Sequence, residues 1–332
     1  MLSAIPTDEK SNLTPNGCIN TEGYLCRNHC ALPEKKKHLD PRTHRVCVNG
    51  CVRHPLNLSI ANSGSDFPQH KVVCALQCAG NRRHDMRTLV KGVQRIDCID
   101  NDAHVTFASF QVECQDDSWY GASIPLSRAL DSDKEVVLAL ERNGKPLSIR
   151  HGYPMWMITP GLAGARAVKW LDRITSQNHY MRRDYKALPP HATDSALAEI
   201  YWNVTSAVQD MPIDSVIVSP RTGDKMKRDN NGCVECFGYA LPSGESGLVV
   251  KVDVSTDEGY TWTEAKLEHH DGGGKWTWKF GRVEIAILRG ESMVILSKAT
   301  DASSRTQPSL PPWNLYRVCY NGYGEARDLT IR

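Results

Sequence analysis

The chain has neither a long hydrophobic run nor a large net charge. No stretch of about 18 consecutive apolar residues occurs, which is the length that a membrane-spanning helix needs. The net charge is +2 at pH 7, and no segment combines dense basic residues with aromatic ones, as nucleic-acid-binding surfaces do. We therefore expect no membrane and no nucleic acid among the partners, although a small anion can still be attracted locally.

We expect no targeting segment in the sequence. The first ten residues contain acidic side chains and Pro6, and they resemble neither a signal peptide nor an Arg-rich transit peptide. The last three residues, Thr330, Ile331 and Arg332, differ from the Ser-Lys-Leu peroxisomal signal. We expect an intracellular protein, and the sequence leaves mitochondrial and peroxisomal locations open.

The cysteines show no regular spacing. The 332 residues include 12 cysteines, 40% hydrophobic residues and 23% charged residues, a composition typical of a globular protein with a sizeable core. Cys233 and Cys236 form a CxxC pair, but no second Cys or His pair lies at the distance that a zinc finger requires. We interpret most cysteines as reduced core residues and do not predict a structural zinc site.

One segment, residues 72–83, combines a thiol with two guanidinium groups. The apolar residues 72–76 predict a buried strand that ends just before Cys78. Gly80 allows a sharp turn, and two arginines follow it. Thiolates bind soft transition metals, and guanidinium groups bind oxyanions through paired hydrogen bonds. The alternative is that Cys78 is a small buried hydrophobe and that the arginines are solvated.

Residues 76–83 have the sequence LQCAGNRR, which resembles the molybdenum-binding signature of the sulfite oxidase family. This family also includes the molybdenum domain of assimilatory nitrate reductases. The resemblance implies that Cys78 is the only protein ligand of a molybdenum atom, whose other sulfur ligands come from molybdopterin. It also implies that Arg83 points into the substrate pocket.

Two further segments resemble substrate-binding motifs of the same family. Residues 27–29, Arg-Asn-His, occupy the family's position before the cysteine motif, and the resemblance assigns Arg27 to the anion pocket and His29 to the pterin. Residues 184–186 resemble the family's Asp-Tyr-Lys, in which the tyrosine hydroxyl, here that of Tyr185, reaches the substrate. Without the resemblance, a surface turn and a structural tyrosine are the simpler interpretations.

Residues 151–170 resemble two family segments that bind the pterin and its phosphate. The resemblance assigns His151, Arg166 and Lys169 to the cofactor. Glycines in the segment let the backbone approach a ligand closely, and Arg166 and Lys169 offer positive charge to a phosphate. A lone His before Gly is otherwise most often a capping or packing residue.

The chain departs from the family at three places. Trp156 and Tyr316 stand where the family has arginines, which removes one expected phosphate contact and one anion-pocket charge. After Cys98 the chain is shorter than the family and lacks the stretch that holds a pocket tryptophan. Either a segment has been lost from the gene sequence or the cofactor cleft is incomplete. The resemblance resumes at Asp116 and Asp117, either of which fits the family's acidic residue near the pterin, and Asp117 is our candidate.

The expected fold class is α+β, with a mixed α/β molybdopterin-binding domain followed by an immunoglobulin-like β-sandwich. From about residue 209 the sequence changes to short, alternating strands, and residues 252–262 resemble the family's immunoglobulin-like dimerisation domain. We predict an N-terminal arm at residues 1–20, the molybdopterin-binding oxidoreductase domain at residues 21–208 and the dimerisation domain at residues 209–332.

Two Asn-Gly pairs predict tight turns between short strands. The pair at residues 49–50 predicts a hairpin that leads toward the cysteine motif. The pair at residues 143–144 predicts a turn after a strand at residues 136–140.

Together the motifs predict a molybdenum-dependent enzyme that oxidises sulfite to sulfate by oxygen-atom transfer. The expected partners are sulfite, a second copy of the chain in a homodimer and an electron acceptor. No His-Pro-Gly-Gly haem motif occurs, so we expect dioxygen or a separate cytochrome as the acceptor. Two alternatives remain open: a nitrate reductase-type molybdenum domain, which normally needs attached haem and flavin modules, and a non-catalytic relative that dimerises without molybdenum.

Overall fold

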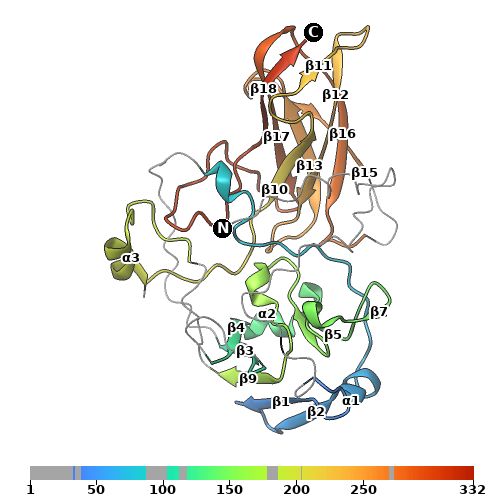
Figure 1. The fold of residues 1–332 in the computed structure, drawn as a ribbon, viewed down its shortest axis with the longest axis vertical. Helices are drawn as coiled ribbons and strands as arrows, with labels where there is room; N and C mark the ends of the chain where they lie inside the picture. The colour runs from blue at the N-terminus through green and yellow to red at the C-terminus, as the bar shows by residue number, and fades with distance from the viewer. Residues whose placement is uncertain are drawn as a thin grey trace.

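The computed structural model describes residue 33 and residues 39–86, 103–111, 118–177, 186–202, 204–268 and 273–332. Figure 1 shows two β-rich parts, a mixed domain at one end of the molecule and a long β-sandwich at the other. The segment around residue 80, cyan in the figure, leaves the mixed domain and ends beside the sandwich strand β10 (Asp214–Ser219). The cysteine motif is therefore placed where the two parts meet.

The mixed domain is built on a five-stranded sheet with the order β2-β1-β9-β3-β4. Its strands are β1 (Arg45–Gly50), β2 (Leu56–Ser59), β3 (His104–Ser109), β4 (Tyr120–Pro125) and β9 (Arg173–Gln177). β1 and β9 run parallel, and the other neighbouring pairs are antiparallel. All six residues of β3 are buried, as a strand covered on both faces requires. Phe107, Ile124 and Met157 belong to the apolar core of this domain.

Short helices and two small sheets complete the mixed domain. The helices are α1 (Ile60–Ser65), α2 (Leu126–Leu130), α3 (Ser195–Trp202) and the 3-10 helices η3 (Arg83–Asp85), η4 (Ser132–Lys134), η5 (Ile149–His151) and η6 (Gly164–Arg166). The small sheets pair β5 (Val137–Ala139) with β8 (Trp156–Ile158) and β6 (Glu141–Arg142) with β7 (Lys145–Pro146). α1 begins after Ser59, whose hydroxyl accepts the backbone N–H of Asn62 and forms a capping box.

The sandwich consists of a four-stranded and a five-stranded sheet. The first has the order β10-β12-β16-β15, and its further strands are β12 (Cys233–Leu241), β15 (Lys266–Glu268) and β16 (Lys279–Ala286). The second has the order β11-β18-β17-β13-β14, with β11 (Lys225–Met226), β13 (Val249–Ser255), β14 (Thr263–Glu264), β17 (Gly290–Asp301) and β18 (Gly324–Ile331). Apolar side chains from both sheets form one core, which includes Val234, Val252 and Ile295. The predicted α+β class with a β-sandwich is confirmed.

One of the two Asn-Gly predictions is confirmed. The other is correct in its hairpin, because β1 pairs antiparallel with β2, but wrong in the position of the turn. Asn143 and Gly144 have φ angles of 54° and 71°, as a two-residue turn with both φ positive requires, and they join β6 to β7. Residues 49–50 instead continue β1, and the reversal into β2 lies at residues 51–55. Gly50 is required for another reason, because a Cβ there would lie 2.1 Å from the carbonyl oxygen of Ser176 on β9.

The CxxC pair lies on strand β12. Because side chains alternate between the two faces of a strand, Cys233 and Cys236, three positions apart, point to opposite faces. Within the described ranges, no group of three or more His, Cys, Asp or Glu side chains is arranged to hold a metal ion. The helices of these ranges are also too short or too polar to cross a membrane.

Candidate functional site

The segment that carries Cys78 is held by the backbone of the cofactor segment predicted at residues 151–170. Gln77 pairs with Ala163 in a parallel bridge, and Gly164 donates its N–H to the carbonyl of Gln77 at 2.6 Å. A Cβ on Gly164 would lie 3.0 Å from that carbonyl oxygen, so a larger residue fits there poorly. The prediction of a buried strand at residues 72–76 is wrong, because these residues form no strand.

Cys78 is exposed between two buried neighbours. Gln77 and Ala79 are 8% and 1% exposed, and the carbonyl of Cys78 accepts the N–H of Asn81 at 2.9 Å. Ala79 packs in a small apolar cluster with Ala163 and other residues of both domains. The alternative that Cys78 is a buried hydrophobe is wrong. The turn that carries the thiol is held in place by its buried neighbours, as a metal ligand requires.

The guanidinium of the first arginine of the motif, Arg82, bonds to other groups of the protein. Its Nε lies 2.9 Å from the Asp85 carboxylate, and its Nη1 lies 2.6 Å from Asp214 at the start of β10. Its other acceptors are the carbonyl oxygens of Ser215, Gly322 and Tyr323. Burial raises the pKa of Asp214 to about 6, and the charge of Arg82 opposes this shift. At pH 7 the carboxylate is therefore ionised and pairs with Arg82.

The second arginine, Arg83, is placed differently. Its Nε is buried and has no hydrogen-bond partner among the described residues. Its guanidinium lies against the backbone of Gly80, where an added Cβ would be 2.8 Å from Nη2. Because Gly80 has no Cβ, the Arg83 guanidinium can pack against the turn that carries Cys78. A buried donor without a partner is costly, so an anion at this position would stabilise the arrangement.

His151 lies in a cluster of basic side chains. Its Nε2 is 2.7 Å from Arg142 Nη1, and its Nδ1 is 2.7 Å from the Ser148 hydroxyl. Burial and then the charges of Arg142, Lys169 and Arg150 lower the pKa of His151. The neutral ring can accept from Arg142 at Nε2 and donate to Ser148 at Nδ1, and the hydrogen-bond network assigns this tautomer.

Lys169 belongs to the same basic cluster and lies against Gly152. Gly152 has φ +88°, and a Cβ there would lie 3.0 Å from the Lys169 side chain. The Lys169 ammonium donates to the carbonyl of Arg150 at 2.9 Å and lies 5.4 Å from the centre of the Trp156 ring. Trp156 is 6% exposed and donates its indole N–H to the carbonyl of Ala167. The Trp156 ring thus packs beside Lys169 of the basic cluster, at the position where the family has arginine.

Arg166 is almost fully buried in η6. Its Nε and Nη2 donate to the carbonyl of Val208 at 3.1 and 3.0 Å. These bonds tie η6 to the segment that leads into the sandwich. The predicted phosphate contact of Arg166 stays a prediction.

The segment at residues 314–319 also contacts the cysteine segment. Asn314 bonds the backbone of Val318 in both directions at 3.0 Å, and Cys319 donates its N–H to the carbonyl of Ala79 at 2.7 Å. Tyr316 is 41% exposed and contacts the Trp202 ring edge to face. Arg317 is also exposed, with φ 48°. Positions 316 and 317 are therefore both at the surface.

Four predicted site residues lie outside the described residues, namely Arg27, His29, Asp117 and Tyr185. The alternative acid Asp116 lies outside them too. Lys186, next to Tyr185 in sequence, is buried and donates to the carbonyl of Trp202, which contacts Tyr316. The segment after Tyr185 thus lies near the segment at residues 314–319.

Sequence reasoning missed several residues of this region. Arg142 contacts His151 from the β6–β7 hairpin, nine residues away, and no spacing rule signals that contact. Ser148 directly precedes η5 and contacts His151 three residues later. Cys319 is brought to the cysteine segment only by the fold, because 240 residues separate it from Ala79. The Arg-Arg pair at residues 82–83 indicated anion binding, but the acceptors that Arg82 bonds in the second domain lie far along the chain.

Two family models match the chain. The oxidoreductase molybdopterin-binding domain matches residues 29–99 and 95–185, and the Mo-co oxidoreductase dimerisation domain matches residues 205–326. The sulfite oxidase of Arabidopsis thaliana is 31% identical, with 89% of this chain and 84% of that protein aligned. The chain belongs to the sulfite oxidase family.

Two further comparisons are consistent with this family assignment. The mitochondrial sulfite oxidase of Mus musculus is 35% identical over 94% of this chain, and the chain spans 63% of the length of that protein. The structure of the sulfane dehydrogenase SoxCD from Paracoccus pantotrophus superimposes with a TM-score of 0.63, at 22% identity, over 88% of this chain and 79% of that chain. The last similarity shows a shared fold.

Proposed function

We propose that this member of the sulfite oxidase family oxidises sulfite to sulfate at a molybdenum–molybdopterin centre bound through Cys78. The observation that carries the proposal is an exposed thiol at Cys78, five residues before the half-buried guanidinium of Arg83. Cys78 is exposed, and Arg83 Nε has no partner in the part of the chain that the structure describes. This donor set suits a thiophilic metal facing an oxyanion.

The cofactor's phosphate fits the basic cluster around His151. Arg142, Arg150, His151 and Lys169 bring positive or neutral donors to one place, and Gly152 keeps the backbone close to Lys169. His29, Asp117 and Arg166 are further proposed contacts of the pterin. Trp156 leaves this cluster one arginine short of the family pattern, so the remaining cations would carry the phosphate charge.

Binding and orientation of sulfite are the tasks of the protein's own side chains. Arg83 would pair with the sulfite oxyanion through its guanidinium, and Arg27 would add a second positive charge. Tyr185 would donate a hydrogen bond from its hydroxyl. These groups are arranged before substrate arrives, which makes the contribution electrostatic preorganisation. The bound cofactor supplies the oxygen transfer and takes up the two electrons that sulfite loses when it becomes sulfate.

The second domain matches a dimerisation model, so we propose a homodimer formed through residues 205–326. The two electrons must leave the site after each turnover. We propose dioxygen or a separate cytochrome as the acceptor. Size-exclusion chromatography with light scattering tests the dimer, and sulfite oxidation with each acceptor in turn tests the exit of electrons.

The departures at Trp156 and Tyr316 favour one other candidate, a non-catalytic relative. Trp156 is buried beside Lys169 and Tyr316 is exposed, so two arginines of the family pattern are replaced by uncharged side chains. Metal analysis of the purified protein separates the two candidates. About one molybdenum per chain supports an enzyme, and a content far below one supports the non-catalytic relative.

Activity assays complete the test. Sulfite-dependent reduction of ferricyanide is expected for the wild-type protein, and Cys78→Ser should abolish it. Wild-type turnover in the Cys78→Ser variant would refute the assignment of the ligand. Turnover with nitrate but not with sulfite would replace the proposal by a nitrate reductase-type domain.

A further inference from the structure

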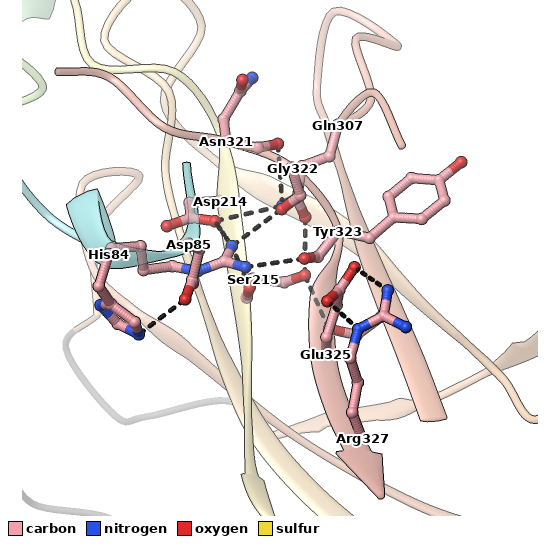
Figure 2. A network of polar contacts seen from close by, with 12 residues as sticks. His84, Asp85, Asp214, Ser215, Gln307, Asn321, Gly322, Tyr323, Glu325 and Arg327 are labelled. Carbon is pink, nitrogen blue, oxygen red and sulfur yellow. Dashed lines mark hydrogen bonds and ion pairs between the residues drawn. The ribbon is translucent and has the colours of Figure 1, made fainter. Parts of the chain in front are cut away.

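The guanidinium of Arg82 joins the cysteine motif to the β-sandwich. Figure 2 labels partners of this guanidinium, namely Asp85, which follows the cysteine motif, and Asp214, Gly322 and Tyr323 of the second domain. Arg82 donates to Asp214 at 2.6 Å, to Gly322 at 2.8 Å and to Tyr323 at 2.7 Å. Its side chain is only 9% exposed, so these bonds are shielded from water.

The acceptors of Arg82 are held in place by the sandwich itself. Gln307 Nε2 donates to Asp214 at 3.2 Å and to the carbonyl of Gly322 at 2.7 Å, so it shares two acceptors with Arg82. Gln307 Oε1 accepts from Ser215 at 2.7 Å and from the backbone of Ala299 at 2.8 Å. The carboxylate and carbonyl that receive Arg82 therefore belong to a connected network inside the second domain.

Arg82 also fixes the backbone next to Arg83. Its φ of 53° is a left-handed conformation, which costs energy for a residue with a Cβ and persists only where the surroundings enforce it. The Tyr320 ring lies under the guanidinium, with 4.8 Å between the guanidinium carbon and the ring centre. A second tie runs from the Cys319 N–H to the carbonyl of Ala79 at 2.7 Å. Residues of the second domain thus hydrogen-bond the cysteine segment on both sides of Gly80, at Ala79 and at Arg82.

From this geometry we propose that Arg82 is a positioning residue through which the β-sandwich sets the placement of Cys78 and Arg83. The two adjacent arginines have divided roles. The Arg82 donors are engaged by the protein, whereas the Arg83 Nε has no partner among the described residues. The inference rests on the proposed sulfite oxidation only where it concerns substrate, and the placement of the Cys78 thiol can be measured without cofactor.

A matched control is available at the same domain junction. Arg128 is 8% exposed and pairs with Asp210 at 2.8 Å, and it donates to the carbonyls of Pro160 and Gly244. Like Arg82, it joins the first domain to an acid of the segment that enters the sandwich. None of these partners belongs to the cysteine motif. Arg128→Lys therefore weakens the junction without touching the turn of Cys78.

The experiment compares full-length Arg82→Lys and Arg128→Lys with the wild-type protein. Lysine keeps the charge but cannot reproduce the planar fork that serves several acceptors at once. We expect similar losses of thermal stability in both variants. Only Arg82→Lys should change the alkylation rate of Cys78 in cofactor-free protein. Because a misplacement of about 1 Å can cost about a hundredfold, its kcat/KM for sulfite should fall about ten- to a hundredfold, mainly through KM.

The outcomes separate this inference from the proposed function. If Arg82→Lys and Arg128→Lys show the same alkylation rate and the same KM, Arg82 has only a structural role and the inference is wrong. If the wild-type protein does not oxidise sulfite, the proposed function fails while the alkylation comparison still decides the positioning role. Should Arg82→Lys fail to fold, Tyr320→Leu removes the ring under Arg82 and keeps its hydrogen bonds. A smaller change in the same direction is then expected, and an unchanged alkylation rate would overturn the inference.

Discussion

The backbone N–H of Cys319 lies 2.7 Å from the carbonyl oxygen of Ala79, one residue after Cys78. This hydrogen bond places a second thiol beside the exposed one. Burial, and then the charge of Cys78, raise the pKa of Cys319 to about 12. The two thiols therefore lie near each other, with Cys78 exposed and Cys319 half-buried.

We predict that Cys78 is alkylated by iodoacetamide at pH 8 much faster than Cys319. The thiolate is the reactive form, and a pKa of about 12 leaves roughly one Cys319 in 10,000 ionised at that pH. Cys236, with a pKa raised by burial to about 12, is a further slow thiol. Time-resolved alkylation with peptide mass spectrometry of cofactor-free protein measures all three rates. Equal rates at Cys78 and Cys319 in folded protein would contradict the placement of the two thiols.

Local chemistry made part of this site predictable. The motif at residues 76–83 pointed to Cys78, and the exposure of its thiol agrees with that interpretation. The different uses of Arg82 and Arg83 were not predictable. The Arg82 acceptors in the sandwich lie more than 130 residues away, and nothing in an Arg-Arg pair tells which side chain they will receive.

The same contrast holds for the fold. Alternating strands after residue 209 indicated the sandwich, since their pattern is local. The Asn143–Gly144 turn was predictable for the same reason. Gly50 was misread as a turn residue, because its need for a small side chain arises from Ser176 on a neighbouring strand. Tertiary approach of two backbones leaves no mark in the sequence around either of them.

The acid stability of the sandwich should depend on Asp257. Hydrogen bonds from Thr261, and a further one from Ser255, lower the pKa of Asp257 to about 2, below its ordinary value of 3.8. The folded protein therefore binds this proton less tightly than the unfolded chain. The stabilisation is complete above about pH 4 and is lost as the pH falls toward 2.

We expect Thr261→Val to raise the pKa of Asp257 and to move acid unfolding to higher pH. The substitution removes the 2.6 Å bond between the threonine hydroxyl and the carboxylate but keeps the backbone donor. Circular dichroism as a function of pH gives the midpoint. Thr263→Val, at another exposed threonine, is the control and should leave the midpoint unchanged. An equal shift in both variants would argue against the Asp257 contribution.

Neutralising Arg142 should raise the pKa of His151. Burial is the largest cause of the lowered pKa, and the charge of Arg142 is the next. Arg142→Gln removes that charge and leaves a side chain that can still donate to Nε2. NMR titration of the imidazole signals measures the shift.

The same substitution should change the pH dependence of stability. A lowered folded pKa means that the unfolded chain takes up the proton more readily, so stability falls as the pH drops through the ordinary His value of 6.5. In Arg142→Gln this loss should be smaller. An unchanged titration in Arg142→Gln would show that the 2.7 Å contact between Arg142 and His151 does not persist in solution.

Replacing Gly80 by alanine should displace Arg83 and weaken sulfite binding. The added methyl would lie 2.8 Å from Arg83 Nη2, too close for any pair of heavy atoms that are not hydrogen-bonded. Because the obstructing group is the end of a flexible side chain, the arginine can move away and the fold should survive. We expect about a tenfold loss in kcat/KM for sulfite, carried mainly by KM, since the misplaced guanidinium binds the oxyanion less well.

Gly64→Ala supplies the matched control for Gly80→Ala. Gly64 lies in α1, where an added Cβ would meet only Leu140 at an ordinary 3.7 Å. This change should leave sulfite kinetics as they are and stabilise the protein by about 0.4–1 kcal/mol, because alanine restricts the unfolded chain. Steady-state kinetics and thermal unfolding of both variants test the pair. A Gly80→Ala protein with wild-type KM would show that Arg83 does not bind the substrate.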